Sequence, residues 1–235
     1  MNDIETGRET LRVGDGTEMA AYRARPKGAA KAPGLLLLQE AFGVNAWIRA
    51  VAERFAREGW SVLAPELFHR TAPGFEGSYG DFAAVQPHLQ ALTADGMAAD
   101  LRAAHARLEQ SGSAGDVCAV GFCMGGRAAF LADAVLPLKA AVSFYGAGIA
   151  PALLDRAPSL SGPILLIWGG RDKHIPPETT AAVSAALRAA GKSFAAAEFS
   201  DGDHGFFCDA RPTYHAPSAV RAWALTLAFL KTRGG

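Results

Sequence analysis

Short apolar runs alternate with longer segments of helical periodicity along most of the chain. The apolar runs predict strands at 34–39, 61–65, 117–122, 140–145, 163–169 and 194–199. The segments between them predict helices at 46–58, 91–110, 126–136, 178–190 and 215–231. This alternation is typical of a mostly parallel sheet with helices on both faces, so we expect an α/β fold.

Two further segments complete the predicted architecture. Residues 9–13 and 19–25 predict an antiparallel hairpin at one edge of the sheet, turning at Asp15-Gly16. Residues 70–90 are rich in proline and glycine and predict a loop or short-helix cap over a site. No repeat, low-complexity tract or linker interrupts the chain, so we expect a single domain over residues 1–235.

The composition excludes several classes of partner. The chain has 235 residues, is 50% hydrophobic, and balances 23 Lys+Arg against 23 Asp+Glu. A net charge of zero and the absence of a basic stripe argue against a protein that binds nucleic acid. Residues 1–5 lack the basic and apolar regions of a secretion signal, and the longest aliphatic run, residues 35–38, is far too short for a membrane span. We therefore expect a cytoplasmic protein without membrane partners, either a monomer or a small homo-oligomer.

The cysteines and histidines predict neither disulfides nor a metal site. Cys118 and Cys123 lie in one extended segment, roughly 16 Å apart at strand rise, which is too far for a disulfide. Cys208 is remote in sequence, and no C-x-x-C pair exists. Four histidines are scattered without ligand spacing: His69, His88, His105 and His215.

The most specific chemical signal is the segment Gly121-Phe122-Cys123-Met124-Gly125-Gly126 after the apolar run 117–120. It reads G-x-C-x-G, the nucleophile-elbow pattern of α/β-hydrolases with cysteine in the place of serine. Such an elbow is a tight strand-to-helix turn that presents a nucleophile in a strained backbone conformation. We therefore predict Cys123 as a nucleophile. The alternative is a glycine-rich turn around a buried, inert cysteine.

An elbow nucleophile needs an acid and then a histidine later in the chain. Asp172 follows the predicted strand 163–169, and His204 lies in a glycine-flanked loop after 194–199. An imidazole can take the thiol proton, and a carboxylate fixes the imidazole's tautomer. Each residue alone could be an ordinary turn or loop residue, but their order and positions together predict a Cys123–His204–Asp172 triad. Asp201 and Asp203 compete as partners of His204, and His174 competes as the base.

At this point a resemblance to the dienelactone hydrolase family becomes clear. It rests on residues 39–45 (Gln-Glu-Ala-Phe-Gly-Val-Asn), residues 64–74, the cysteine elbow, Asp172, and His204-Gly205-Phe206, in the right order over most of the chain. The resemblance implies an α/β-hydrolase fold and hydrolysis of lactone and related ester bonds without metal or cofactor. The family's reference reaction opens dienelactone (carboxymethylenebutenolide) to maleylacetate in the breakdown of aromatic compounds.

The resemblance also implies roles beyond the triad. Glu40 would interact with Cys123 and control its ionisation, and the backbone N–H groups of Ala41 and Met124 would form the oxyanion hole. Arg70 would bind a substrate carboxylate, and Tyr145 would line the pocket. The alternatives without a function are that Glu40 lies on an exposed loop, that Arg70 faces water, and that Tyr145 lies at the edge of the core.

One departure from the family pattern affects the substrate. The family's second carboxylate-binding arginine comes four residues after the catalytic histidine, where this chain has Cys208, and the nearest arginine is Arg211. Either Arg211 takes over, or the carboxylate is bound differently, or the substrate is not a dienelactone. The sequence thus predicts a hydrolase that works through an acyl-thioester, acting on dienelactone or a related anionic lactone. A general thiol carboxylesterase or thioesterase, and a non-catalytic ligand-sensing module, remain alternatives.

Overall fold

The computed structural model describes residues 3–113 and 115–232. They form two compact units, Met1–Cys118 and Ala119–Gly235. The chain passes from the first unit to the second within strand β5 (Val117–Phe122). The expectation of a single domain stays a prediction, and each unit is described by itself.

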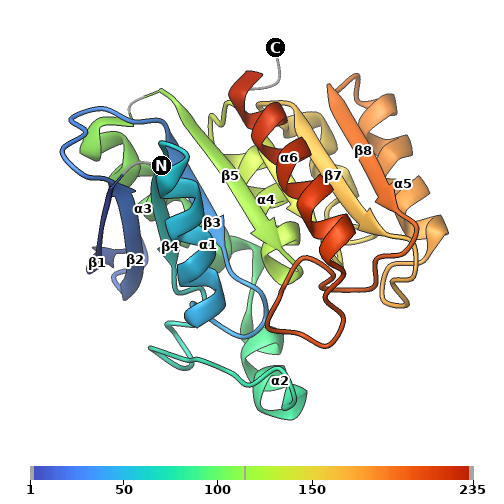
Figure 1. Cartoon of the computed structure of the whole chain (residues 1–235), viewed down its shortest axis with the longest axis horizontal. Coiled ribbons are helices and arrows are strands. Elements are labelled where there is room, and N and C mark those ends of the chain that lie inside the picture. Colours follow the sequence, from blue (N-terminus) through green and yellow to red (C-terminus); the bar gives the residue numbers. More distant parts are fainter. Residues whose placement is uncertain (1–2, 114, 233–235) are drawn as a thin grey trace. The chain divides into compact units, whose positions relative to one another are not determined.

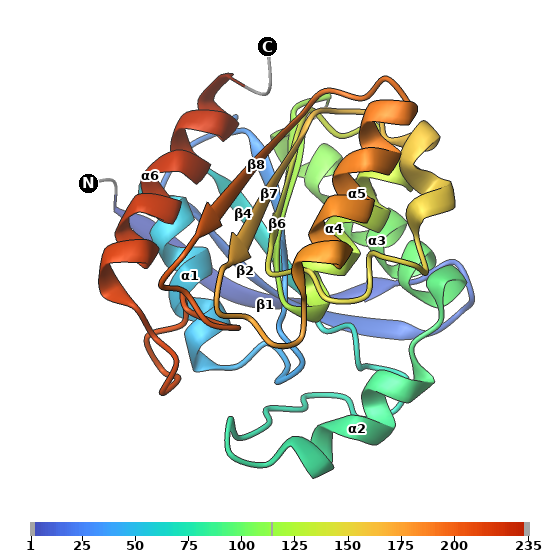
Figure 2. The same ribbon diagram turned by 90° about the vertical axis from the view of Figure 1, so that its right-hand side faces the viewer.

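The first unit is a four-stranded sheet with helices on both faces. Its sheet has the order β1-β2-β4-β3, antiparallel from β1 through β4 and parallel between β3 and β4. Helices α1 and α3 cover opposite faces (Figures 1 and 2). The elements are β1 (Ile4–Arg12), β2 (Glu18–Pro26), β3 (Gly34–Leu38), α1 (Ala46–Arg57), β4 (Ser61–Pro65), α2 (Phe82–Ala91), α3 (Ala94–Leu108) and the short π-turn η1 (Glu109–Ser113).

Two expectations for this unit need correction. The predicted helix 91–110 begins only at Ala94, because the Thr93 side chain caps it by accepting the N–H of Gly96. Ala91 instead ends α2, a separate helix that carries Pro87 inside it. The segment predicted as a loop or short-helix cap thus contains a helix, and its role as a cap over the site stays a prediction. The hairpin is confirmed but longer than predicted, and it turns at Gly16, where φ is +88°.

The second unit is wholly parallel, in the order β5-β6-β7-β8. Helices α4 and α5 lie on one face and α6 on the other (Figure 2). The carboxyl ends of the strands align, with Phe122 beside Phe144 and Phe144 beside Ile167. The remaining elements are α4 (Met124–Val135), β6 (Ala141–Phe144), the 3₁₀ turn η2 (Leu154–Ser159), β7 (Ile164–Gly169), α5 (Pro177–Ala189), β8 (Phe194–Phe199) and α6 (Ala216–Thr232).

Strand bounds in both units agree with the sequence-based prediction to about one residue, except in the hairpin. Helix α4 begins two residues earlier than predicted because Cys123 itself is its N-cap. The turn η2 was not predicted. Within residues 3–113 and 115–232, no helix combines the length and apolarity needed to cross a membrane.

Candidate active site

Cys123 lies on the sharp turn that joins β5 to α4. Its backbone has φ +56° and ψ −118°, a conformation that side-chain-bearing residues rarely adopt. A Cβ atom on Gly121 would collide with the carbonyl oxygen of Gly125, and one on Gly126 would lie 2.6 Å from the carbonyl oxygen of Phe144. Glycine at these two positions therefore permits the turn, and the predicted elbow geometry is present.

The start of α4 provides a favourable environment for negative charge. Cys123 is the N-cap of this helix, so its backbone lies at the positive end of the helix dipole. Met124 is the first helical residue, and the N–H of such a residue has no acceptor within its own helix. The backbone position predicted for one oxyanion-hole donor is thus compatible with that role, which stays a prediction.

Asp172 and His204 lie in the turns that follow β7 and β8. The Nδ1 of His204 is 2.7 Å from Oδ2 of Asp172, and both side chains are almost completely buried. The other carboxylate oxygen of Asp172 accepts the backbone N–H of His174 at 2.8 Å. The carboxylate is therefore fixed from two sides, and Nδ1 of His204 is the nitrogen that donates to it.

His204 also forms a hydrogen bond with Cys123. Burial, the strongest single influence, lowers the pKa of His204, but hydrogen bonds with Asp172 and Cys123 and the negative charges of both raise it to about 10. The imidazole is therefore a cation at neutral pH, held between a carboxylate and a sulfur. The three residues predicted from the sequence meet at one point of the second unit.

The residues that compete with Asp172 and His204 in the sequence make other contacts in the structure. Asp203 accepts the backbone N–H of His204 at 2.7 Å, and the exposed Asp201 pairs with Arg171 at 2.8 Å. The exposed ring of His174 contacts the ring of His204 edge-on, at 5.1 Å between centroids. None of the three replaces Asp172 or His204 in the arrangement. Asp203 instead fixes the backbone of the histidine loop.

Tyr145 forms an apolar wall beside the imidazole. It is completely buried, its φ is +36°, and its ring centroid lies 5.2 Å from that of His204. Positive φ in a bulky residue is strained, and such strain concentrates at functional sites. The ring also packs against Phe206 at 5.7 Å. Tyr145 thus lies next to the triad, and its predicted role in substrate binding stays a prediction.

Arg211 is the cation closest in sequence to the histidine loop's Cys208. A Cβ atom on Gly205 would collide with the guanidinium of Arg211, so this group lies directly over the residue that follows His204. Gly205 has φ +80° and tolerates this close approach because it lacks a side chain. Cys208 is buried. Arg211 therefore lies close to the catalytic histidine in the chain, and its role as a second carboxylate-binding arginine stays a prediction.

The other predicted site residues belong to the first unit. Glu40 and Ala41 follow β3 and are both buried, which excludes the alternative of a glutamate on an exposed loop. Arg70 is exposed, but its guanidinium is paired with two acids. Its guanidinium forms two hydrogen bonds with Asp100, at 2.8 and 2.9 Å, and two with Asp15, at 2.7 and 2.9 Å. The predicted binding of a substrate carboxylate by Arg70 would compete with these two acids.

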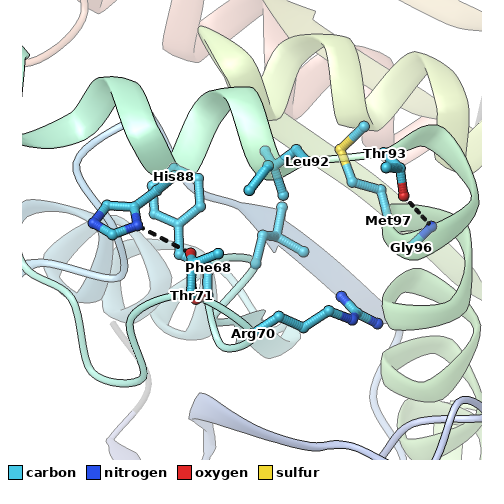
Figure 3. Close-up of a pocket in the computed structure, with 10 residues that line it drawn as sticks. Phe68, Arg70, Thr71, His88, Leu92, Thr93, Gly96 and Met97 are labelled. Carbon is cyan, nitrogen blue, oxygen red and sulfur yellow. Dashed lines mark hydrogen bonds between the residues drawn. The ribbon is translucent and has the colours of Figure 1, made fainter.

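Arg70 also lines a small hollow at the junction of α2 and α3 (Figure 3). His88 and Thr71 form one side, joined by a 3.0 Å hydrogen bond, and Met97 forms another. The lining is mainly apolar apart from these groups, and it contains no candidate nucleophile. Among residues 3–113 and 115–232, no cluster of three or more His, Cys, Asp or Glu side chains could hold a metal ion.

Comparison with known proteins decides the family. The model of the dienelactone hydrolase family matches residues 19–234. The chain belongs to the dienelactone hydrolase family. It is 39% identical to a “Putative carboxymethylenebutenolidase” of Escherichia coli, over 94% of this chain and 84% of that protein. A protein of the same name from Synechocystis sp. is 34% identical, with 94% of each chain covered.

Solved structures support the same assignment. A “Putative Dienelactone Hydrolase” from Klebsiella pneumoniae subsp. pneumoniae superposes with a TM-score of 0.91 at 33% identity, covering 98% of this chain and 99% of that one. Brefeldin A esterase, at 16% identity and a TM-score of 0.72 over all of this chain and 78% of its own, shares the fold alone. The dienelactone hydrolase family member described here has the α/β-hydrolase fold and is a carboxylic-ester hydrolase.

Proposed function

We propose that this dienelactone hydrolase family member is a cysteine-dependent hydrolase that opens a lactone or ester through an acyl-thioester on Cys123. One observation supports this most strongly. His204 bonds to Asp172 at 2.7 Å and also to Cys123, whose backbone is held in the strained elbow conformation. A buried, inert cysteine would need neither the imidazole nor the carboxylate behind it.

Acylation begins with attack of the Cys123 sulfur on the substrate carbonyl carbon. The N–H groups of Ala41 and Met124 are the proposed donors to the oxygen that becomes negative. When the tetrahedral intermediate collapses, the C–O bond breaks, and the leaving alkoxide or enolate takes the proton of the His204 imidazolium. In a lactone the leaving oxygen stays attached to the acyl group.

Deacylation depends on how acylation changes His204. Two of the influences that raise its pKa come from Cys123, namely a hydrogen bond and a negative charge. Both disappear once the sulfur carries an acyl group, while burial still lowers the pKa. His204 then becomes a base able to take a proton from water, which attacks the thioester and releases the acid. The same residue thus serves first as an acid and then as a base.

The proposed substrate is an anionic lactone, with dienelactone as the first candidate. The curated relatives carry the name carboxymethylenebutenolidase, and Arg211 lies over Gly205, beside the catalytic histidine. Glu40 is the proposed regulator of Cys123 ionisation, because a buried carboxylate near a sulfur would disfavour its negative charge.

A second candidate is a thiol carboxylesterase or thioesterase for uncharged substrates. The pairing of Arg70 with Asp15 and Asp100 favours it, because this arginine is then already neutralised. Comparing kcat/KM for dienelactone with that for neutral aryl esters and thioesters separates the two candidates. A preference for dienelactone supports the anionic lactone.

Replacing the nucleophile tests the proposal. We expect Cys123→Ala to lower kcat for any accepted ester by at least about 10⁴-fold while the circular dichroism spectrum is retained. Cys208→Ala, at a buried cysteine, is the control and should keep most activity. Normal hydrolysis by Cys123→Ala would refute the cysteine mechanism. A stable adduct on wild-type Cys123 without product release would favour the ligand-sensing alternative.

A further inference from the structure

Arg127 is a cation in the first turn of α4 that the proposed mechanism does not use. Its backbone N–H donates to the carbonyl oxygen of Cys123 at 3.2 Å, so it lies one helical turn after the nucleophile. Side chains on a helix tilt toward its N-terminus. The side chain of Arg127 therefore extends toward the carboxyl edge of β5–β8, where Asp172 and His204 also lie.

The loop after β6 holds this side chain. An ideal Cβ on Gly148 would lie 3.4 Å from Cδ, 3.6 Å from Nη1 and 4.0 Å from Nε of Arg127. Two residues earlier, Gly146 packs so closely on Gly126 that a Cβ on Gly126 would lie 2.9 Å from its Cα. The same loop begins at Tyr145, whose ring contacts His204. The guanidinium of Arg127 and the triad are thus connected by one short, tightly packed loop.

Nothing in the described chain satisfies the guanidinium. Nε of Arg127 is inaccessible to solvent and has no hydrogen-bond partner, and Arg127 forms no ion pair within residues 3–113 and 115–232. Arg70 and Arg107, by contrast, each bind a carboxylate. A buried donor without a partner is destabilising, so such groups are rare and call for an explanation. Arg127 is only half-buried as a whole, which leaves part of its guanidinium accessible.

We propose that Arg127 binds an anionic group of the substrate, a carboxylate, near the acyl group that Cys123 would carry. This inference rests on the proposed function of Cys123. The Cα atoms of residues one helical turn apart are separated by roughly 6 Å, so the carboxylate would lie a few bonds from the carbonyl carbon that Cys123 attacks. A guanidinium can hold a carboxylate with two parallel N–H bonds. Arg127 thereby selects substrates that carry a negative charge on the acyl side.

Matched substrates and variants test this selection. The anionic probe is the 4-nitrophenyl monoester of glutaric acid, and the neutral probe is 4-nitrophenyl pentanoate, in which a methyl group replaces the carboxylate. The measured quantity is the ratio of kcat/KM for the anionic ester to that for the neutral ester. We expect Arg127→Met to lower this ratio about 10- to 100-fold, mainly through KM, and Arg127→Lys to lower it less.

Arg156→Met, at an exposed arginine of η2, is the control and should leave the ratio unchanged. A merely structural role of Arg127 would lower kcat/KM for both esters equally, so an unchanged ratio in Arg127→Met and Arg127→Lys would overturn the inference.

Failure of this inference can be distinguished from failure of the proposed function. If wild-type Cys123 is acylated but the ratio does not respond to Arg127, only the selection is refuted. If neither ester acylates wild-type Cys123, the proposed function itself fails, and the inference with it.

Discussion

Within residues 3–113 and 115–232, each unit has one buried pair of histidine and aspartate, and the two pairs differ in what contacts the rest of the imidazole. In the Asp172–His204 pair, Nδ1 lies 2.7 Å from the carboxylate and the ring also bonds to the sulfur of Cys123. In the Asp100–His69 pair, Nε2 lies 3.1 Å from the carboxylate and Nδ1 donates to the backbone carbonyl of Glu18 at 3.1 Å.

This difference distinguishes a pair with a proposed catalytic role from a pair with a structural role. Both nitrogens of His69 face oxygen acceptors of the protein, and Asp100 is further held by two hydrogen bonds from Arg70. This imidazole therefore has no nitrogen to offer a substrate. His204 instead contacts the sulfur of Cys123, the proposed nucleophile. The same two residue types thus form a proposed catalytic device in one unit and a structural clamp in the other.

The largest contrast is expected between the two histidines. His204→Gln should lower kcat by about 10³- to 10⁴-fold, because no acid remains for acylation and no base for deacylation. His69→Gln should leave kcat within about threefold and instead lower the free energy of unfolding by about 1–3 kcal/mol, since a buried acid loses a donor. Steady-state kinetics and urea unfolding of both variants measure this. Equal loss of kcat in both would remove the distinction.

The two aspartates should show the same contrast, with a loss of kcat that can be smaller than that of the histidine variant. Asp172→Asn should lower kcat about 10²- to 10⁴-fold, because the amide no longer fixes the tautomer of His204. Asp100→Asn should instead lower the free energy of unfolding by about 3 kcal/mol, since Arg70 and His69 both lose a buried carboxylate. Activity assays and denaturant melts at one pH provide the comparison. An Asp100→Asn protein that is fully stable but inactive would contradict it.

The catalytic pair should also make stability depend on pH. The pKa of His204 is raised to about 10 from an ordinary value of 6.5. The resulting stabilisation is therefore fully present below about pH 6.5 and is lost as the pH rises through about 10. Unfolding free energies measured from pH 6 to 10 should fall by up to about 1.4 kcal/mol per pH unit. Cys123→Ala should flatten this slope. An identical slope in the variant would show that the sulfur does not hold the imidazolium.

A further buried carboxylate extends the comparison, because it pairs with neither histidine nor arginine. Asp133 of α4 accepts hydrogen bonds from Ser161 and from the N–H of Gly162. Burial, partly offset by these bonds, raises the pKa of Asp133 to about 7. The folded state then holds a proton that the unfolded state releases at lower pH.

Stability should accordingly fall as the pH rises from about 4 to 7, in a window separate from that of His204. Asp133→Asn should remove this dependence and keep activity. Of the four predictions for the buried histidines and aspartates, Asp133→Asn has the smallest expected effect. We expect about 1 kcal/mol or more of added stability at pH 8. Urea melts at pH 5 and pH 8 measure it. A variant that is less stable than wild type at pH 8 would argue that Asp133 is not a protonation site.

The fold was largely predictable because apolar runs mark buried parallel strands clearly. Residues 117–122 and 194–199 were predicted with the bounds that β5 and β8 have. The start of α3 was missed, although the Thr93 cap could have revealed it. The position of the triad was predictable too, because the carboxyl ends of parallel strands share one edge of a sheet.

What the sequence could not predict are partners remote along the chain. Arg70 lies 55 residues from Asp15 and 30 from Asp100, and no local pattern connects them. Its expected role toward a substrate carboxylate ignored these acids. The proposed role of Arg127 was not predicted either. Its signal was a lone charge in the first turns of a helix start made of small and apolar residues, Met124 to Ala129.

The acyl-thioester on Cys123 is the central claim, and trapping it tests that claim most directly. Wild-type protein and Asp172→Asn, mixed with 4-nitrophenyl acetate and quenched in acid during turnover, can be digested and mapped by mass spectrometry. The account predicts one acetyl group on the peptide that contains Cys123, absent from Cys123→Ala. Steady hydrolysis with no acetyl group on Cys123, or with the group on another residue, would contradict it.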